Sequence, residues 1–264
     1  MEHVFENNIT WDENNLLSHK KMWEKQRNLV LIMAGGLGKR MNSDLPKVLH
    51  ELNGLPLIVH VVKSALHMDA TSIIYIIVGK YREQIEKAIN DHFMKTDSIR
   101  YINQPEPLGT GHAIQCCLPT LKEYFPDSRV LILSGDVPLF STQSMREVMK
   151  NRCSTIVCTQ MEDPHGYGRI IHAPIRIVEE KDCSEEERRV KLVNCGIYAF
   201  ENEFLWKNLP KINNENAQHE YYLTSIFSGG EEEIKIFEIP AEKQYEVCGI
   251  NTPEQLEEMR SKTV

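Results

Sequence analysis

A glycine-rich turn with basic residues beside it is the first part of the sequence that could do chemistry. The apolar run LVLIM at 29–33 leads into a small residue and three glycines: Ala34, Gly35, Gly36 and Gly38. Arg40 and Lys47 follow within a few residues. Glycines let backbone N–H groups approach a ligand closely, and such a turn can bind an anion. The spacing matches neither G-x-G-x-x-G nor the P-loop pattern, so we predict another kind of phosphate loop, with a plain strand-to-helix turn as the alternative.

Two oxygen donors could hold a metal near that loop. Asp136 follows the apolar run at 130–133, and Asn251 follows the apolar residue of GIN at 249–251. We expect both at strand ends, where open α/β sheets gather their ligands. A carboxylate and an amide oxygen suit Mg²⁺, which takes few protein ligands when it binds phosphates. The alternatives are a turn aspartate capping the helix that starts near Ser141, and an asparagine in a helix-start turn.

A second glycine-rich turn, PEPLGTGH at 105–112, enters a helix. Its N–H groups could contact a base edge or a phosphate. Gln104, just before it, offers the donor and acceptor pair that can hydrogen-bond uracil. We expect His112 to be a helix histidine with satisfied ring nitrogens. The remaining histidines of interest show no ligand spacing and are expected on the surface: His165, His172 and His219.

Composition excludes several classes of function. The chain has 264 residues, a net charge of −8 and seven cysteines without a C-x-x-C pair. An acidic chain without a long basic stripe argues against nucleic-acid binding, and the cysteines indicate reduced thiols rather than a disulfide framework or zinc site. No apolar run reaches membrane-spanning length, and the N-terminus does not resemble a signal peptide. These features predict a cytoplasmic protein.

The elements that position these residues alternate in the first half of the chain. Apolar runs predict strands at 29–33, 72–78, 99–102 and 130–133. Helical spacing predicts helices at 56–68, 82–93 and 110–124, the first with Pro56 at position N1. Asn53-Gly54, which lies just before the helix expected at 56–68, predicts a hairpin turn. Alternation of this kind predicts an α/β fold with a doubly wound parallel sheet.

The second half predicts further strands that extend the sheet in a mixed, partly antiparallel way and roof the pocket: 155–159, 169–172, 176–179, 192–200 and 234–239. Residues 185–190 are expected as a short charged helix or an exposed turn, and 220–227 as a helix. Thr252-Pro253-Glu254-Gln255 combines a capping box with proline at N1 and opens a last helix. Residues 1–27 form an extension with a helix over about 13–27, which we expect to dock on the domain or on another subunit; a free tail is the alternative.

Many ordered motifs resemble one family from about residue 28 onward. They are AGGLGKRM, SDLPKVLH, QPEPLGTGHA, GDVPL, GYGRI, IVEEKD, NCGIYAF, NAQHEYYLT and GINTPEQL. The order is that of the sugar-phosphate nucleotidylyltransferases, and the best match is to the uridylyltransferase domain of the bacterial bifunctional N-acetylglucosamine-1-phosphate uridylyltransferase/acetyltransferases. The resemblance implies one nucleotidylyltransferase domain at 28–264, of Rossmann-like, nucleotide-diphospho-sugar transferase type. No hexapeptide repeat of an acetyltransferase β-helix is present in the sequence.

The resemblance also implies roles for individual residues. Arg40 and Lys47 are implied as catalytic groups on the phosphates. Nucleotide-binding roles are implied for Ala34, Gly35, Gly36, Gly38, Gln104, Gly109 and Thr110. The implied amino-sugar site is Gly168, Glu179, Asn194, Tyr222 and Thr224, with Glu179 and Asn194 expected at strand ends. Asp136 and Asn251 are implied as Mg²⁺ ligands.

The implied reaction joins UTP and N-acetylglucosamine 1-phosphate to give the UDP-sugar and pyrophosphate. Four positions depart from the family pattern: Lys39 for threonine, Pro107 for glutamine, Ser134 for tyrosine and Ser225 for aspartate. Pro107 and Ser134 keep another sugar 1-phosphate or TTP open as substrates. A non-catalytic nucleotide-sugar-binding subunit is the alternative from a different class.

Overall fold

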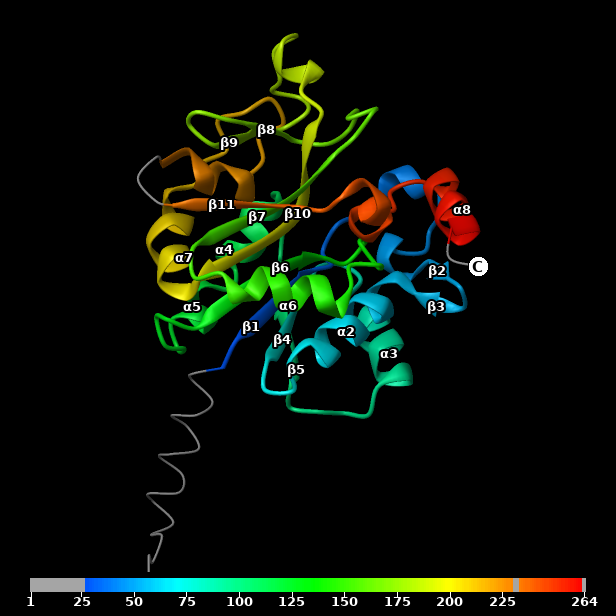
Figure 1. Cartoon of the computed structure of the whole chain (residues 1–264). Helices are drawn as coiled ribbons and strands as arrows, with labels where there is room; N and C mark the ends of the chain where they lie inside the picture. The colour runs from blue at the N-terminus through cyan, green and yellow to red at the C-terminus, as the bar shows by residue number, and fades with distance from the viewer. Residues whose placement is uncertain (1–26, 230–232, 263–264) are drawn as a thin grey trace, which may run out of the picture.

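A mixed, mostly parallel β-sheet forms the centre of the molecule (Figure 1). The computed structural model describes residues 27–229 and 233–262. The main path of the sheet runs β11-β7-β10-β6-β1-β4-β5, and only β10 is antiparallel to its neighbours. The strands of this path are β1 (Leu29–Met33), β4 (Ile73–Val78), β5 (Ile99–Asn103), β6 (Arg129–Ser134), β7 (Ser154–Gln160), β10 (Leu192–Glu201) and β11 (Ile234–Glu238). The doubly wound α/β fold is therefore confirmed.

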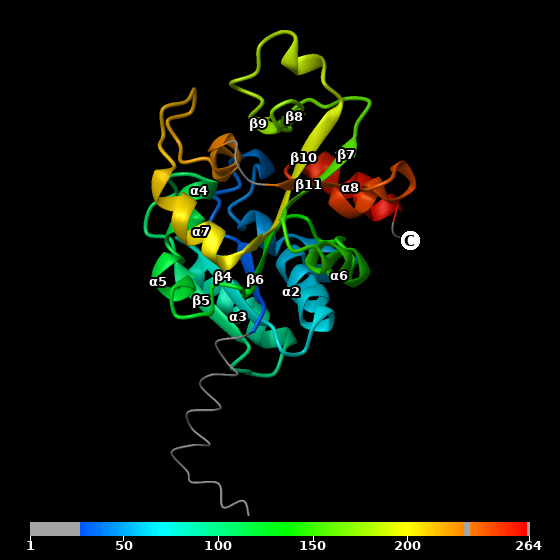
Figure 2. The same cartoon turned by 60° about the vertical axis from the view of Figure 1, so that its left-hand side comes forward.

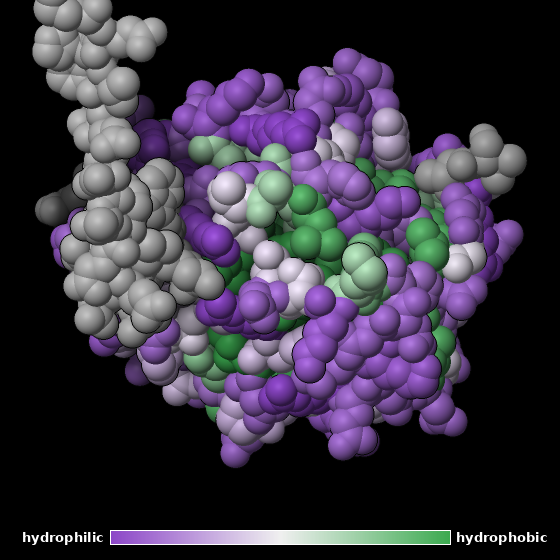
Figure 3. Space-filling model, turned by 90° about the horizontal axis from the view of Figure 1, so that it is seen from below, coloured by the Kyte–Doolittle hydropathy of each residue, from purple (hydrophilic) through white to green (hydrophobic). Residues whose placement is uncertain are grey.

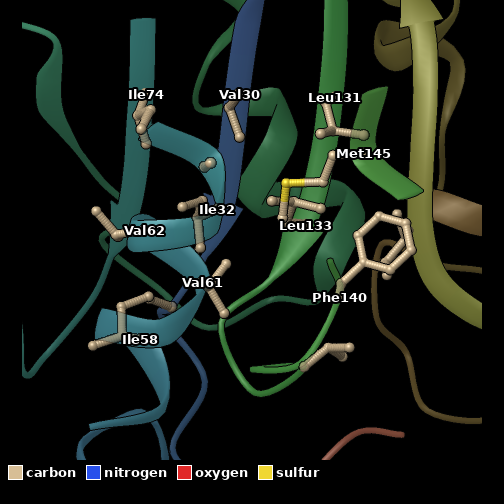
Figure 4. Packing of buried hydrophobic residues seen from close by; sticks show 14 of the residues in the cluster. Val30, Ile32, Ile58, Val61, Val62, Ile74, Leu131, Leu133, Phe140 and Met145 are labelled. Carbon is tan, nitrogen blue, oxygen red and sulfur yellow. The ribbon is translucent and has the colours of Figure 1, made fainter. Parts of the chain in front are cut away.

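Alternate side chains of the central strands enter two different cores, because successive residues of a strand point to opposite faces. On one face, Val30 and Ile32 of β1 pack with helices α2 (Leu57–Met68), α3 (Arg82–His92) and α6 (Thr142–Lys150). Figure 4 shows Ile58 and Val61 of α2 beside this strand, with Met145 of α6 beyond them. On the other face, Leu29 and Leu31 pack with α4 (Thr110–Gln115), α5 (Leu118–Leu121) and α7 (Asn202–Asn208).

A small third core joins the two ends of the described chain. Strands β2 (Glu51–Leu52) and β3 (Leu55–Pro56) form the predicted hairpin, with Asn53 and Gly54 at positive φ. Leu256 and Met259 of helix α8 (Pro253–Lys262), with Ile250 before it, form this core with Leu52 of the hairpin and Leu57 at the start of α2. Half of the predicted capping box is present: Gln255 N donates to Thr252 Oγ1 at 3.3 Å, but Gln255 Oε1 accepts from Asn251 N rather than from Thr252 N. This packing brings the segment around Asn251 to the segment that carries Lys47.

Two hairpin strands, β8 (Arg169–Ile171) and β9 (Arg176–Val178), lie away from the main path of the sheet. Figures 1 and 2 both place them beyond the end of β10. The only register position that links them to the sheet pairs Val193 with Arg169. The buried Arg169 guanidinium bonds to Glu180 at 2.8 Å, which ties the hairpin to the loop after β9. Glu179 directly follows this hairpin, and the expectation that these strands roof the pocket stays a prediction.

Three predicted elements are wrong in detail. The helix expected over 110–124 breaks after Gln115, because Pro119 cannot donate a hydrogen bond to the Gln115 carbonyl and its ring clashes there. The helix expected over 220–227 is instead the 3₁₀ helix η5 (Leu223–Gly229). Pro56 is the N-cap of α2 rather than N1, because it still pairs with Glu51 in the hairpin.

The remaining 3₁₀ helices are short connections: η1 (Lys39–Met41), η2 (Lys47–Leu49), η3 (Glu187–Arg189), η4 (Leu209–Lys211) and η6 (Ala241–Val247). The short charged helix expected at 185–190 is η3. The helix expected over about 13–27 and its docking lie outside the described residues, apart from residue 27. Among the described residues, no helix is both long and apolar enough to cross a membrane.

The underside of the molecule is mostly hydrophilic. Figure 3 shows this face with a hydrophobic area near its centre, on the side where the chain enters β1. Parallel strands β1, β4, β5 and β6 begin on this side, so their carboxyl ends, and the site described next, lie at the opposite edge of the sheet.

Candidate active site

A cavity of about 530 Å³ opens at the carboxyl ends of the central strands. Its walls come from the glycine loop after β1, the segment of η2, the loop between β5 and α4, and the turn after β6. The lining residues are Met33, Ala34, Gly35, Gly36, Leu37, Lys47, Val48, Gln104, Pro107, Gly109, Thr110, Ala113, Ser134, Asp136 and Glu220. The two glycine-rich turns predicted from the sequence therefore face one cavity.

The glycine loop is held against the neighbouring strand and against Lys47. Ala34 N donates to Ile77 O of β4 at 2.8 Å. Gly38 has φ +61°, and a Cβ there would lie 2.6 Å from the Lys47 Cβ. Only glycine fits this approach without moving the backbone. The loop and the stem of Lys47 thus pack as one unit on the phosphate side of the cavity.

Four of the predicted phosphate and metal residues meet at this side of the cavity. The Lys47 ammonium forms an ion pair with Asp136 and donates to Asn251 Oδ1 at 3.0 Å. Arg40 Nη2 donates to the same Asn251 oxygen at 3.0 Å. Arg40 is exposed, whereas Asp136 is 8% exposed. Asp136 and Asn251 thus contact the same ammonium, that of Lys47, which the sequence did not place between them.

Asn251 reaches the site without a strand. It follows η6 and a short connection, so the prediction that it ends a strand is wrong. Ile250 N donates to the Asp136 carbonyl at 2.9 Å, and Asn251 N donates to Gln255 Oε1 at 2.7 Å. These bonds and the third core hold the asparagine in place, whereas Asp136 follows β6 as predicted.

The Asp136 carboxylate is stabilised in its charged form. Burial acts to raise its pKa, but the Lys47 ammonium and the Ser134 hydroxyl outweigh burial, so the pKa lies below its ordinary value. Ser134 Oγ donates to Asp136 Oδ1 at 2.5 Å. Ser134, one of the four departures from the family pattern, also lines the cavity.

The donor set fits Mg²⁺ bound together with phosphates. Asp136 offers a carboxylate and Asn251 an amide oxygen, and both contact one cation, the Lys47 ammonium. No group of three or more His, Cys, Asp or Glu side chains in the described ranges could cage a metal. Magnesium is usually held by one or two carboxylates plus substrate phosphates and water, and this site supplies that kind of incomplete shell.

The proposed base side lies at the second glycine-rich turn. Gln104 is buried, and its Nε2 donates to Gly109 O at 3.2 Å. A Cβ on Gly35 would lie 2.5 Å from Gln104 Oε1, so this glycine makes room for the amide. Thr110 Oγ1 accepts from Leu223 N at 3.0 Å. His112 is satisfied as predicted, because its Nδ1 lies 2.9 Å from the Glu106 carbonyl.

The five predicted sugar-side residues gather around Glu179, and none of them is among the described residues that line the cavity. Thr224 Oγ1 donates to Glu179 Oε1 at 2.8 Å, and a Cβ on Gly168 would lie 3.5 Å from Glu179 Oε2. Asn194 N donates to Gly168 O at 2.9 Å. The Tyr222 side chain is buried in the same region, where burial and the Asp182 and Glu179 carboxylates raise its pKa. Glu179 follows β9 as expected, but Asn194 lies inside β10 at a register shift, so its expected strand end is wrong.

Burial raises the pKa of the Glu179 carboxyl above its ordinary value. The hydrogen bond from Thr224 opposes this shift, while the Asp182 and Glu220 carboxylates add to it. The region therefore concentrates negative charge beside the cavity, and such a carboxylate accepts hydrogen bonds strongly from hydroxyl or amide groups.

Two residues of the site escaped the sequence analysis. Glu220 lines the cavity, and in the described ranges its carboxylate shows no hydrogen-bond partner. Tyr198 accepts a 2.7 Å hydrogen bond from Asn194 Nδ2 and orients that amide. Both residues stand in motifs that could have directed attention to them: Glu220 in NAQHEYYLT and Tyr198 in NCGIYAF.

The structure defines an α/β protein with a mostly parallel central sheet and a cavity at the carboxyl ends of its strands. Two solved structures share the fold. UDP-glucose pyrophosphorylase complexed with UDP-glucose aligns with a TM-score of 0.67 at 17% identity, over 89% of this chain and 98% of that chain. The 4-diphosphocytidyl-2C-methyl-D-erythritol synthase of Anaerococcus prevotii aligns with a TM-score of 0.62 at 18% identity, over 91% and 97% of the two chains.

A family model described as nucleotidyl transferase matches residues 29–240, and the chain belongs to this family. A probable UDP-N-acetylglucosamine pyrophosphorylase of Acanthamoeba polyphaga mimivirus is 38% identical, over 88% of this chain and 94% of that protein. The bifunctional protein GlmU of Acinetobacter baylyi is 40% identical over 86% of this chain. The alignment covers 50% of that GlmU, so this chain spans about half the length of the bifunctional relative.

Proposed function

We propose that this protein transfers a uridylyl group from UTP to N-acetylglucosamine 1-phosphate, releasing pyrophosphate. One observation carries the proposal most directly: Arg40, Lys47, Asp136 and Asn251 meet beside the glycine loop at one end of the cavity. The similarity to the mimivirus pyrophosphorylase, which extends over nearly all of that protein, supports this sugar and this nucleotide.

The reaction needs positioning more than acid–base chemistry. The sugar phosphate is largely dianionic at neutral pH, because the second pKa of such a monoester is about 6. Its oxygen can attack the α-phosphorus of UTP without a base, and the bond to pyrophosphate breaks. The difficulty is to bring one anion to another, and cations and N–H groups that neutralise charge along this path lower the barrier.

Lys47 and Arg40 are the groups of this chain that meet the phosphates. Their cationic ends lie together at the Asn251 oxygen, so both can turn from that oxygen to phosphate oxygens. Asp136 and Asn251 would hold Mg²⁺, which when bound supplies further charge neutralisation on the phosphates. Gln104 and the turn of Gly109 and Thr110 would bind the uracil and ribose. Glu179, with Asn194 and Thr224 beside it, would accept hydrogen bonds from the amino sugar.

Both substrates are small soluble molecules of the cell interior, so we propose that the protein works in the cytoplasm. The experiment that tests the function is release of pyrophosphate by the purified protein with each nucleoside triphosphate and each sugar 1-phosphate. UTP with N-acetylglucosamine 1-phosphate should give the highest kcat/KM. A higher value for TTP or for glucose 1-phosphate would replace the proposed substrates, and the absence of release with every pair would favour a binding subunit.

A further inference from the structure

The proposed metal ligands already share a cation in the described structure. The Lys47 ammonium pairs with Asp136 Oδ2 and lies 3.0 Å from Asn251 Oδ1. We infer that Lys47 is the resident cation of the metal site in the nucleotide-free protein, and that it leaves this place for the phosphates when a divalent metal enters with a nucleotide. The inference rests on the proposed function, because that function assigns the metal to Asp136 and Asn251.

The backbone of Lys47 is fixed, whereas its ammonium stands at the end of a flexible side chain. Lys47 begins η2, whose next residues, Val48 and Leu49, are buried. Its stem packs on Gly38 of the glycine loop. The side chain is 17% exposed at the cavity wall. A lysine carries its charge on a flexible four-carbon stem, so the ammonium can move from the carboxylate toward the cavity without a change in the fold.

A divalent metal alone meets two cations at this site. Besides Lys47, Arg40 Nη2 donates to Asn251 Oδ1 at 3.0 Å. The other oxygen of Asp136 already accepts the Ser134 hydroxyl at 2.5 Å. The metal must therefore displace an ammonium from two oxygens at once, and it is repelled by the guanidinium next to them.

Phosphates change this balance because they offer both cations new partners. Lysine and arginine bind phosphate oxygens strongly, so a nucleotide can take Lys47 and Arg40 while the metal takes Asp136 and Asn251. Metal and nucleotide should then strengthen each other's binding by the same factor, as thermodynamic linkage requires. The site should therefore bind a divalent metal weakly without nucleotide and tightly together with a nucleotide.

Binding of Mn²⁺, measured by electron paramagnetic resonance without nucleotide, tests the inference. The parent should bind Mn²⁺ weakly, and Lys47→Met, which removes the resident charge, should bind it at least tenfold more tightly. Lys47→Arg keeps the charge and should stay weak. Lys63→Met removes a charge from the exposed face of α2 and should match the parent. Addition of UTP should tighten Mn²⁺ binding at least tenfold in the parent and less in Lys47→Met.

Equal Mn²⁺ affinity of Lys47→Met and the parent without nucleotide would overturn the inference. If Lys47→Met is too unstable for titration, thermal unfolding with and without Mn²⁺ replaces it. Mn²⁺ should then raise the melting temperature of Lys47→Met and leave that of the parent unchanged, and equal shifts would contradict the exchange. Pyrophosphate release by the parent is measured separately. If the parent releases pyrophosphate but Lys47→Met and the parent bind Mn²⁺ equally, only this inference is refuted. If Lys47→Met binds Mn²⁺ more tightly but the parent releases no pyrophosphate, only the proposed function is refuted.

Discussion

The Lys47 ammonium and the Asp136 carboxylate form an ion pair across 89 positions of the sequence. The pair joins the segment after the glycine loop to the turn after β6, and both lie at the carboxyl edge of the sheet. Because Asp136 is nearly buried, its charge depends on this partner and on Ser134. The same lysine that stabilises the carboxylate in the described structure is the one we expect at the phosphates during transfer.

Replacing Lys47 by alanine should reduce turnover far more than UTP binding. A positioned cation that faces charge developing in a transfer reaction contributes about 3–4 kcal/mol, so kcat should fall roughly 10²–10³-fold. The KM for UTP should change much less, since the glycine loop and Gln104 remain. Steady-state pyrophosphate release measures both constants, and a kcat within about threefold of the parent would refute the assigned role.

Asp136→Asn should remove most of the turnover because it keeps the shape of the side chain and removes its charge. We expect a loss of at least about 10³-fold, in line with several kcal/mol from metal-assisted charge stabilisation. Asn251→Ala should cost less, since water can replace a neutral oxygen. Activity should also disappear with EDTA and return with Mg²⁺. Circular dichroism checks that both variants fold, and full activity in EDTA would contradict the metal assignment.

Gly35→Ala should disturb base recognition, because its new methyl would lie 2.5 Å from Gln104 Oε1 and push that amide aside. We expect the preference for UTP over CTP to fall about tenfold, with a stability loss of about 1 kcal/mol from the bond to Gly109. Gly36→Ala is the matched control, since its methyl would meet no protein atom within 4 Å. The control should keep the parent's free energy of unfolding within about 0.5 kcal/mol. Unchanged base preference in Gly35→Ala would remove Gln104 from the base site.

Glu179→Gln should weaken sugar binding and stabilise the fold at high pH. Loss of a charged acceptor costs about 1.5–3 kcal/mol, so the KM for the sugar phosphate should rise roughly 10–100-fold while that for UTP stays the same.

The pKa of Glu179 is raised in the folded protein. Its contribution to stability is therefore fully present below the unfolded-state pKa and is lost as pH rises through the folded-state pKa. Glutamine does not titrate, so the melting temperature of the variant relative to the parent should increase from pH 5 to pH 8.

Equal rises in both Michaelis constants would show that Glu179 serves the nucleotide as well as the sugar. Thr224→Val offers a second check on the pH effect. It removes the hydrogen bond that holds the Glu179 pKa down, so the pKa should rise further. The stability of Thr224→Val should then fall more steeply with rising pH than that of the parent.

The sequence predicted the sheet and the phosphate side of the site because those depend on local signals. Apolar runs closed by glycine or aspartate identified β1, β4 and β6, and the topology of parallel strands placed Asp136 beside the glycine loop. The residue types also indicated Asn251 as an amide donor, but among the described residues the strand expected before it does not exist. The local sequence pattern alone could not show that packing in the third core brings Asn251 next to Lys47.

One error, the helix expected over 220–227, comes from long-range contacts that leave no periodic pattern in the sequence, whereas the helix break at Pro119 has a local cause. The segment at 220–222 is not helical because Tyr221 pairs with the other glycine-rich turn: its N–H donates to Leu108 O at 2.8 Å and its carbonyl accepts from Gly111 N at 2.6 Å. Gly111 permits this approach, since a Cβ there would lie 2.8 Å from the Tyr221 oxygen.

The docking of α8 on the β2–β3 hairpin has a consequence for a chain still being made on the ribosome. The glycine loop, Lys47 and Asp136 leave the ribosome long before Asn251, and domains tend to fold from the N-terminal side during synthesis. The lysine and the carboxylate can pair early, but the amide that shares the ammonium arrives only with the segment at 249–262. A nascent chain that stalls before this segment cannot assemble the full set of ligands, however much of the sheet has formed, so catalysis has to wait for the end of translation of this domain.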